Sequence, residues 1–125
     1  MIVDTNALSD IFKKKKGIGP RLLQADALYL PVIVLGEYLF GLKGSKKRIE
    51  LLNLLEGFLK TVTVLGIDKL TAQNYSDIRW ELKSAGTPVP ENDIWIAALA
   101  RQYRVQILSN DSHFDRVSGI IRMGW

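Results

Sequence analysis

Apolar residues along the chain fall into two kinds of run, which alternate from one end to the other. Short runs, rich in β-branched residues or ending in turn signals, predict strands over residues 2–4, 28–30, 61–65, 105–108 and 120–121. Longer runs with helical spacing predict helices over residues 6–16, 31–41, 46–60, 68–85 and 94–100, with another short helix after Pro20. This alternation predicts a three-layer α/β/α domain with a central, mainly parallel sheet.

Three of these helices have distinct faces. In residues 46–60, leucine and isoleucine recur every three or four positions, at Ile49, Leu52, Leu55 and Leu59. Asp68 is a suitable N-cap for the next helix, whose inner face is expected at Thr71, Tyr75, Ile78, Leu82 and Ala85. Residues 94–100 are apolar almost all round, which predicts a helix buried on every side.

Length and composition limit the class of protein. A chain of 125 residues and 14.1 kDa suits one compact domain over residues 1–125, and 47% hydrophobic with 24% charged residues is too apolar for disorder. Cysteine is absent, so disulfides are excluded. The longest uncharged stretch, residues 27–36, is too short to span a bilayer, and an acid at position 4 does not suit a secretory leader. We therefore expect a cytoplasmic protein without a membrane segment.

The net charge of +4 and a pI near 9.4 favour polyanionic partners. The positive charge is concentrated in two clusters, one of Lys13, Lys14, Lys15 and Lys16 and the other of Lys43, Lys46, Lys47 and Arg48. Each cluster is either a solvated helix end or a surface for the phosphate backbone of RNA, and both interpretations stay open.

Two aspartates follow predicted strands. Asp4 ends the first strand, and Asp111 comes shortly after the strand at residues 105–108. In parallel α/β sheets ligands bind at the carboxyl ends of the strands, so these two side chains are expected to face one crevice. The alternative is that each aspartate is simply a helix N-cap or a turn residue.

Two further acids lie within apolar helices. Glu37 is the only charged residue of residues 31–42, and burying an unpaired carboxylate costs several kcal/mol. It is expected to face a solvent-filled cleft or a cation, with a salt bridge to lysine as the alternative. Gly36 and Gly41 flank it, which suggests that another group approaches closely. Asp93 lies in the first turn of the buried helix, where an acid also stabilises the helix dipole.

Carboxylates that meet in one crevice need a counter-ion. Because cysteine is absent and His113 is the only histidine, the available ligands are mostly oxygens, which excludes a zinc site and indicates Mg²⁺ or Mn²⁺. His113 itself is interpreted as an ordinary loop or helix-start residue, and Phe114 as a core residue. A divalent ion held in this way can support phosphodiester hydrolysis without a protein nucleophile.

Four short segments together carry a family resemblance. They are Asp4-Thr5-Asn6, Gly36-Glu37 with Gly41, Asn92 to Ala98, and Ser109 to Phe114. In this order and at these intervals, over the whole chain, they resemble the VapC toxins of the PIN-domain family. The resemblance implies a Mg²⁺-dependent endoribonuclease (Mn²⁺ is also plausible) that is the toxin of a type II toxin–antitoxin system.

The resemblance also assigns roles. Asp4, Glu37, Asp93 and Asp111 match the catalytic and metal-binding acids, Thr5, Asn6 and Ser109 the supporting polar residues, and Asp115 is kept as a further candidate. It implies a homodimer and a small VapB-type antitoxin whose C-terminal segment lies across the site. Leu39, Leu52 and Leu55 are candidate contacts for that antitoxin, although they serve equally well as core residues.

Two other functions remain. One is a phosphoacceptor receiver domain, but receivers carry an adjacent acid pair after the first strand, where Asp4 stands alone. The other is a non-catalytic PIN-like module that binds RNA. Which RNA is bound cannot be predicted, because phosphate contacts carry no sequence information.

Overall fold

The sheet at the centre of the molecule is parallel throughout. A computed structural model describes all residues 1–125 and contains five strands in the order β3-β2-β1-β4-β5. They are β1 (Ile2–Val3), β2 (Tyr29–Pro31), β3 (Thr63–Leu65), β4 (Ile107–Leu108) and β5 (Arg122–Met123), and every neighbouring pair is parallel. Val3 pairs with Leu108, so the residues that follow β1 and β4 leave the sheet side by side.

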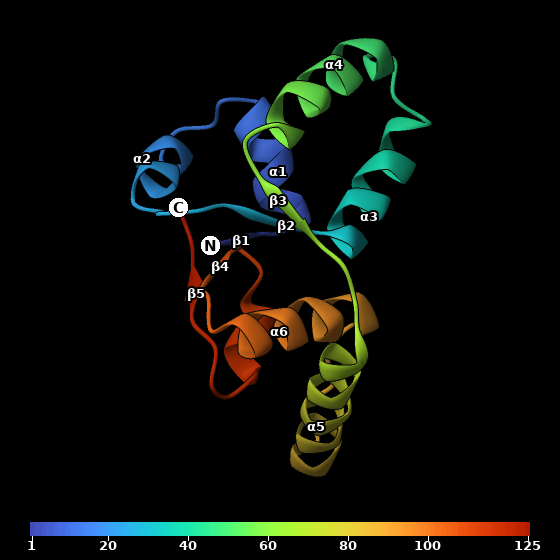
Figure 1. Cartoon of the computed structure of the whole chain (residues 1–125), viewed down its shortest axis with the longest axis vertical. Coiled ribbons are helices and arrows are strands. Elements are labelled where there is room, and N and C mark those ends of the chain that lie inside the picture. Colours follow the sequence, from blue (N-terminus) through green and yellow to red (C-terminus); the bar gives the residue numbers. More distant parts are fainter.

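Helices cover both faces of this sheet (Figure 1). On one side lie α1 (Thr5–Phe12), α2 (Ile18–Leu23), α3 (Val32–Leu42) and α4 (Arg48–Leu59). On the other lie α5 (Lys69–Ala85), α6 (Glu91–Tyr103) and the short 3₁₀ helix η1 (Ser112–Arg116). The predicted three-layer α/β/α fold with a parallel sheet is therefore confirmed. None of these helices is both long enough and apolar enough to cross a membrane.

The core lies between the sheet and its two helical layers. Both residues of β1 and both residues of β4 are fully buried, as continuous apolar strands of a parallel sheet should be. In α6 the buried residues run from Ile96 to Ala100 without a break, which confirms the predicted buried helix. Phe114 is 1% exposed, so its interpretation as a core residue is also confirmed.

The ends of several predicted elements were wrong. The strands predicted at residues 61–65 and 105–108 begin only at Thr63 and Ile107, and the helix predicted at residues 94–100 is Glu91–Tyr103. The first helix stops at Phe12 rather than at Lys16, and the lysines form the turn that follows, in which Lys14 has a left-handed backbone (φ 51°). The last strand is Arg122–Met123 rather than residues 120–121, because Ile107 N–H bonds to the Ile121 carbonyl just before the register of β5 begins.

Two predicted helix faces were partly wrong. In α4, Leu55 is buried and Leu52 and Leu59 are partly buried against the core, as predicted, but Ile49 in the first turn is 78% exposed. In α5, capped by Asp68 as predicted, Thr71, Ile78 and Leu82 are buried but Ala85 is exposed at the last turn. The helices themselves form where the pattern placed them.

Candidate active site

Asp4 sits where β1 ends and α1 begins, and its two carboxylate oxygens have different partners. Oδ1 accepts the Thr5 backbone N–H at 2.8 Å, which makes Asp4 the N-cap of α1. Oδ2 accepts the Ser109 hydroxyl at 2.7 Å. Asp4 is 5% exposed. Asp4 is therefore a helix N-cap, the alternative that the sequence left open. Its second oxygen also binds the loop after β4, the strand beside β1 in the sheet.

Ser109 and Asn6 connect Asp4 to the loop after β4. Ser109 is completely buried, and its Oγ also accepts the Asp111 backbone N–H at 3.0 Å. The Asn6 side-chain amide lies 3.4 Å from both Asp4 Oδ2 and Ser109 Oγ. The structure therefore brings the first acid together with Asn6 and Ser109, two of the three polar residues to which the resemblance gave a supporting role.

Asp93 and Asp111 meet at the single histidine. Asp93 lies in the first turn of α6, and Asp111 is the N-cap of η1, where its Oδ1 accepts the His113 backbone N–H at 2.9 Å. The His113 ring Nδ1 is 3.2 Å from Asp93 Oδ2 and 2.9 Å from Asp111 Oδ1. Ligand atoms of these three residues all lie within 4.8 Å of one another.

This placement corrects the interpretation of His113 as an ordinary loop residue. It does begin η1, as expected, but its ring contacts two of the acids. Its position two residues after Asp111 was the only signal in the sequence, because Asp93 is 20 residues away and comes near only through the fold. The site therefore holds one imidazole nitrogen in addition to its oxygens.

Glu37 reaches the same region from α3. It is half-buried, and it takes part in none of the ion pairs of the structure, so the lysine salt bridge considered from the sequence is wrong. Burial raises the pKa of Glu37, the charges of Asp4 and Asp93 raise it further, and a hydrogen bond with Asn92 acts in the opposite direction. Glu37 is thus close enough to two of the other acids to be repelled by their charge.

The pKa values of Asp4 and Asp93 are raised in the same way. Burial raises the pKa of Asp4, and the charge of Asp111 adds to this effect. Burial also raises the pKa of Asp93, as do the charges of Asp4 and Asp111, while the hydrogen bond to His113 lowers it. Four acids from three helical segments and one loop therefore repel one another at a shared position, and a cation there would relieve the repulsion.

The donor set fits a hard divalent ion. Carboxylate oxygens are the ligands that Mg²⁺ and Mn²⁺ prefer, and here they outnumber the single imidazole nitrogen. A second observation agrees: Thr5 Oγ1, next to Asp4, is the only buried side-chain polar atom in the molecule without a hydrogen-bond partner. A buried hydroxyl without a partner costs about 1–3 kcal/mol, and a water or an ion beside Asp4 would satisfy it.

Asp115 points to another partner. Its two carboxylate oxygens each lie 2.8 Å from a nitrogen of Arg122, and this bidentate pair lowers the pKa of Asp115. Its side chain is 53% exposed. The structure thus pairs Asp115 with a cation on β5 rather than with the other acids.

Both basic clusters are exposed, and each follows a helix that carries an acid. Lys13 is the C-cap of α1, which Asp4 begins, and Lys43 is the C-cap of α3, which holds Glu37. A rise of 1.5 Å per residue places them about 13 Å and about 9 Å along the helix from those acids. Of the first cluster, Lys15 pairs with Asp10 at 3.6 Å. The clusters are therefore separate from the acidic site.

Two sequence expectations near the site had other outcomes. Outside the backbone of α3 itself, no atom lies within 4 Å of where a side chain on Gly36 or Gly41 would begin, so the expected close approach does not occur within this molecule. Leu55, a candidate antitoxin contact, is 2% exposed and belongs to the core, whereas Leu39 is 38% exposed.

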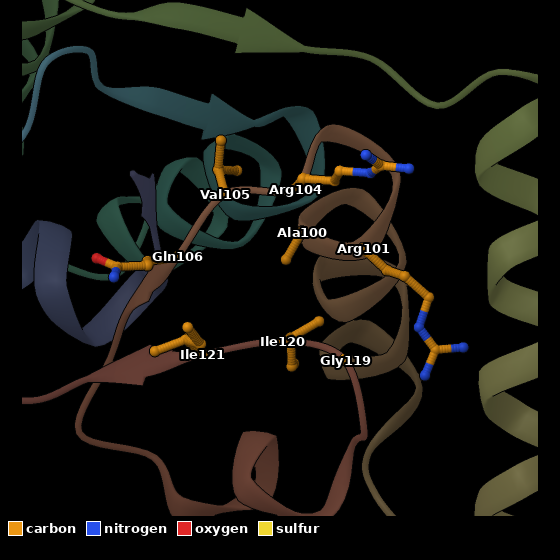
Figure 2. Close-up of a pocket in the computed structure, with 8 residues that line it drawn as sticks. All are labelled: Ala100, Arg101, Arg104, Val105, Gln106, Gly119, Ile120 and Ile121. Atoms are coloured by element: carbon orange, nitrogen blue, oxygen red, sulfur yellow. The ribbon is translucent and has the colours of Figure 1, made fainter.

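A cavity of about 400 Å³ lies at the opposite, amino-terminal edge of β4 and β5 (Figure 2). Ala100, Val105, Ile120 and Ile121 supply its apolar wall. In Figure 2 the Arg101 side chain extends away from these residues towards α5, where it pairs with Glu81 at 2.8 Å. None of the four acids lines this cavity. The acidic site is thus separate from this cavity.

A three-layer domain with acids gathered at the carboxyl edge of a parallel sheet belongs to the α/β proteins that bind their ligands at this edge. Comparison with known proteins places it. The family model described as "PIN domain" matches residues 1–120. The chain belongs to the PIN-domain family.

Relatives within this family agree over nearly the whole chain. It is 31% identical to "tRNA(fMet)-specific endonuclease VapC" of Salmonella typhimurium and 30% identical to the protein of that name from Shigella flexneri, each over 99% of this chain and 96% of the relative. Among solved structures it is similar to DNA-bound VapBC from Salmonella typhimurium, with a TM-score of 0.88, 31% identity and coverage of 99% and 96%. A VapBC2 complex from Rickettsia felis, at 24% identity, has a TM-score of 0.90 and supports the fold alone.

Proposed function

We propose that this protein is a Mg²⁺-dependent endoribonuclease, with Mn²⁺ as an alternative ion, and that it is the toxin of a VapBC-type toxin–antitoxin pair. The observation that carries the proposal is the meeting of Asp4, Glu37, Asp93 and Asp111 at one place, where burial and the charges of neighbouring acids raise the pKa values of Asp4, Glu37 and Asp93. Relatives about 30% identical over the full chain are named as VapC endonucleases, which supports the reaction class.

The four acids would hold the ion, with Thr5 Oγ1 and His113 Nδ1 beside them. When bound, such an ion lowers the pKa of water and stabilises charge on the departing oxygen of the phosphodiester. The chain's own contribution is orientation. Ser109 fixes one oxygen of Asp4, the N-terminus of α1 fixes the other, and His113 links the carboxylates of Asp93 and Asp111.

The substrate is proposed to be RNA with an accessible single-stranded loop, because specific cleavage needs bases that are not paired. The two basic clusters, Lys13–Lys16 and Lys43–Arg48, are proposed to contact its phosphates on either side of the cut. Because these relatives are named as tRNA(fMet)-specific endonucleases, the initiator tRNA, tRNA(fMet), is the first RNA to test.

The proposed partners are a second copy of the chain and a VapB-type antitoxin. Exposed apolar side chains of α3 and α4 offer a surface for the antitoxin, namely Val32, Leu39, Phe40, Ile49 and Leu54. Where such side chains form one contiguous patch on a small domain, the patch usually marks a protein–protein contact. A cationic side chain of the antitoxin that paired with the acids would exclude the metal ion.

The test is cleavage of purified initiator tRNA and bulk RNA in Mg²⁺, in Mn²⁺ and in EDTA. We expect cleavage with either ion, none in EDTA, and a loss of at least about 100-fold in Asp4→Asn and Asp93→Asn. Asp77→Asn, an exposed carboxylate on α5 purified in the same way, should cleave like the wild type. Undiminished cleavage in EDTA would rule out the metal-dependent mechanism, and RNA binding without cleavage would favour the non-catalytic module.

A further inference from the structure

We propose that Trp125 is a positioning residue for the acidic site, because it ties the loop that carries Asp111 to the helix that Asp4 begins. The expected effect of Trp125 on RNA cleavage rests on the proposed function, whereas its expected effect on Mn²⁺ binding does not. Neither the family match, which ends at residue 120, nor the names of the relatives assign a role to this residue.

Trp125 makes two hydrogen bonds that reach two different elements. Its indole Nε1–H donates to Asp10 Oδ2 on α1 at 3.2 Å. Its backbone N–H donates to Asn110 Oδ1, in the loop after β4, at 3.1 Å. One residue therefore bridges the two segments whose separation decides how far Asp4 lies from Asp111.

The hydrogen bonds continue from Asn110 into the site. The Asn110 backbone N–H donates to Asn6 Oδ1 at 3.4 Å. The Asn6 side-chain amide in turn lies 3.4 Å from Asp4 Oδ2. A path of hydrogen bonds thus runs from Trp125 through two asparagines to the carboxylate that is most deeply buried among the four acids.

The preceding glycine keeps this segment against the loop. A Cβ on Gly124 would lie 2.8 Å from Asn110 Oδ1 and 3.4 Å from Arg122 Nη1, closer than ordinary contacts allow. On the other side, Arg21 Nε of α2 donates to the Gly124 carbonyl at 2.9 Å. The Gly124–Trp125 segment is therefore clamped between α2 and the loop, in a position that only glycine permits without a shift of Asn110.

The same loop is held from β5. Arg122 Nη1 donates to the Ser109 carbonyl at 3.2 Å while its other nitrogens bind Asp115. Ser109 is the residue whose hydroxyl bonds Asp4. The residues from Arg122 onwards thus support the site loop through main-chain and side-chain contacts, and Trp125 supplies the only one of these that also reaches α1.

The experiment uses Trp125→Phe, which keeps an aromatic ring but removes the bond to Asp10, and Asn110→Ala, which removes the acceptor for Trp125. Trp80→Phe, at a 67% exposed tryptophan, and Asn53→Ala, on the exposed face of α4, are the matched controls. Binding of Mn²⁺ alone is measured from the EPR signal of the free ion. Cleavage kcat and KM for RNA, and the thermal midpoint, are measured on the same samples.

We expect Trp125→Phe and Asn110→Ala each to weaken Mn²⁺ binding and lower kcat about tenfold, with KM for RNA unchanged and the controls like the wild type. Gly124→Ala, which must displace Asn110, is expected to do the same. If the variants lose thermal stability but bind Mn²⁺ within twofold of the wild type, Trp125 only anchors the chain and the inference is overturned. If the wild-type protein cleaves no RNA but the variants bind Mn²⁺ more weakly than it does, this inference is upheld and the proposed function is refuted.

Discussion

His113 Nδ1 lies 3.2 Å from Asp93 Oδ2, although 20 residues separate the two in the chain. The same nitrogen is 2.9 Å from Asp111 Oδ1. A single ring thus links the carboxylates that come from the start of α6 and from the loop after β4. Groups that orient metal-binding carboxylates in this way affect activity almost as much as the ligands do.

Removal of this ring is expected to disorder both carboxylates. In His113→Ala, we predict a fall of about tenfold in kcat for RNA cleavage and a higher Mg²⁺ concentration for half-maximal rate. His113→Gln, whose amide can still reach a carboxylate, should keep part of the activity. Cleavage kinetics over a Mg²⁺ titration check this, and an unchanged metal requirement in His113→Ala would show that the contact is incidental.

The half-buried carboxylate of Glu37 should make stability depend on pH in the absence of metal. Burial and the charges of Asp4 and Asp93 raise the pKa of Glu37. The folded protein therefore holds this proton more tightly than the unfolded chain does. The stability contributed in this way is complete below the ordinary glutamate pKa of about 4.3 and is lost as the pH rises through the folded value.

Glu37→Gln removes this dependence. In EDTA, we predict that the variant has the same thermal midpoint as the wild type near pH 4 and one about 2–5 °C higher at pH 7.5. Glu56→Gln, an exposed carboxylate on α4, gives the baseline for the substitution. Differential scanning calorimetry at both pH values is the measurement. A thermal midpoint of Glu37→Gln that did not exceed that of the wild type at pH 7.5 would mean that the environment of Glu37 is wrongly described.

The buried hydroxyl of Thr5 gives a separate prediction. Because Thr5 Oγ1 has no hydrogen-bond partner, replacing it with a methyl group in Thr5→Val should stabilise the metal-free protein by about 1 kcal/mol. In the presence of Mg²⁺ the same variant should cleave RNA more slowly, because it loses the contact that the wild-type hydroxyl would make with the ion or with a water beside Asp4. Urea denaturation in EDTA tests the first statement, and a loss of stability there would contradict it.

The basic clusters should affect RNA affinity and leave the chemistry unchanged. In K43A/K46A/K47A, we predict weaker RNA binding with an unchanged kcat at saturating RNA. The salt dependence of binding should become shallower by about 0.7 for each phosphate that the variant no longer neutralises. The exposed lysines of K60A/K69A/K83A lie outside both clusters and are the control. RNA-binding isotherms between low and high salt measure how steeply affinity depends on salt. An unchanged dependence in K43A/K46A/K47A would mean that this cluster is a solvated turn that does not contact RNA.

Much of the fold could be predicted because local patterns and global packing agree. The apolar run of α6 predicts a buried helix, and Asp68 predicts the start of α5, each from a few residues. The structure contains both features. The end of α1 could not be predicted, because lysine favours helix and nothing before Gly17 signals a stop. The register of β5 also escaped prediction, because it is set by main-chain hydrogen bonds and not by the isoleucines before it.

The acids could be proposed from the sequence because a carboxylate in an apolar context is costly, as Glu37 illustrates. The meeting of the four is a consequence of strand order, since Asp4 and Ser109 leave neighbouring strands. Contacts between distant segments had no such signal. Neither the approach of His113 to Asp93 nor the bridge made by Trp125 can be read from spacing, because each depends on the final packing of helices against the sheet.

The central claim is that negative side chains from separate elements share one divalent ion. Anomalous diffraction from crystals soaked in Mn²⁺ tests it most directly, with crystals of Asp93→Asn collected in parallel. The account predicts a peak in contact with Asp4 and Asp93 in the wild-type protein, weakened or absent in the variant. The account would be contradicted if Mn²⁺ appeared only elsewhere on the surface and the carboxylates of the site were bound to protein groups alone.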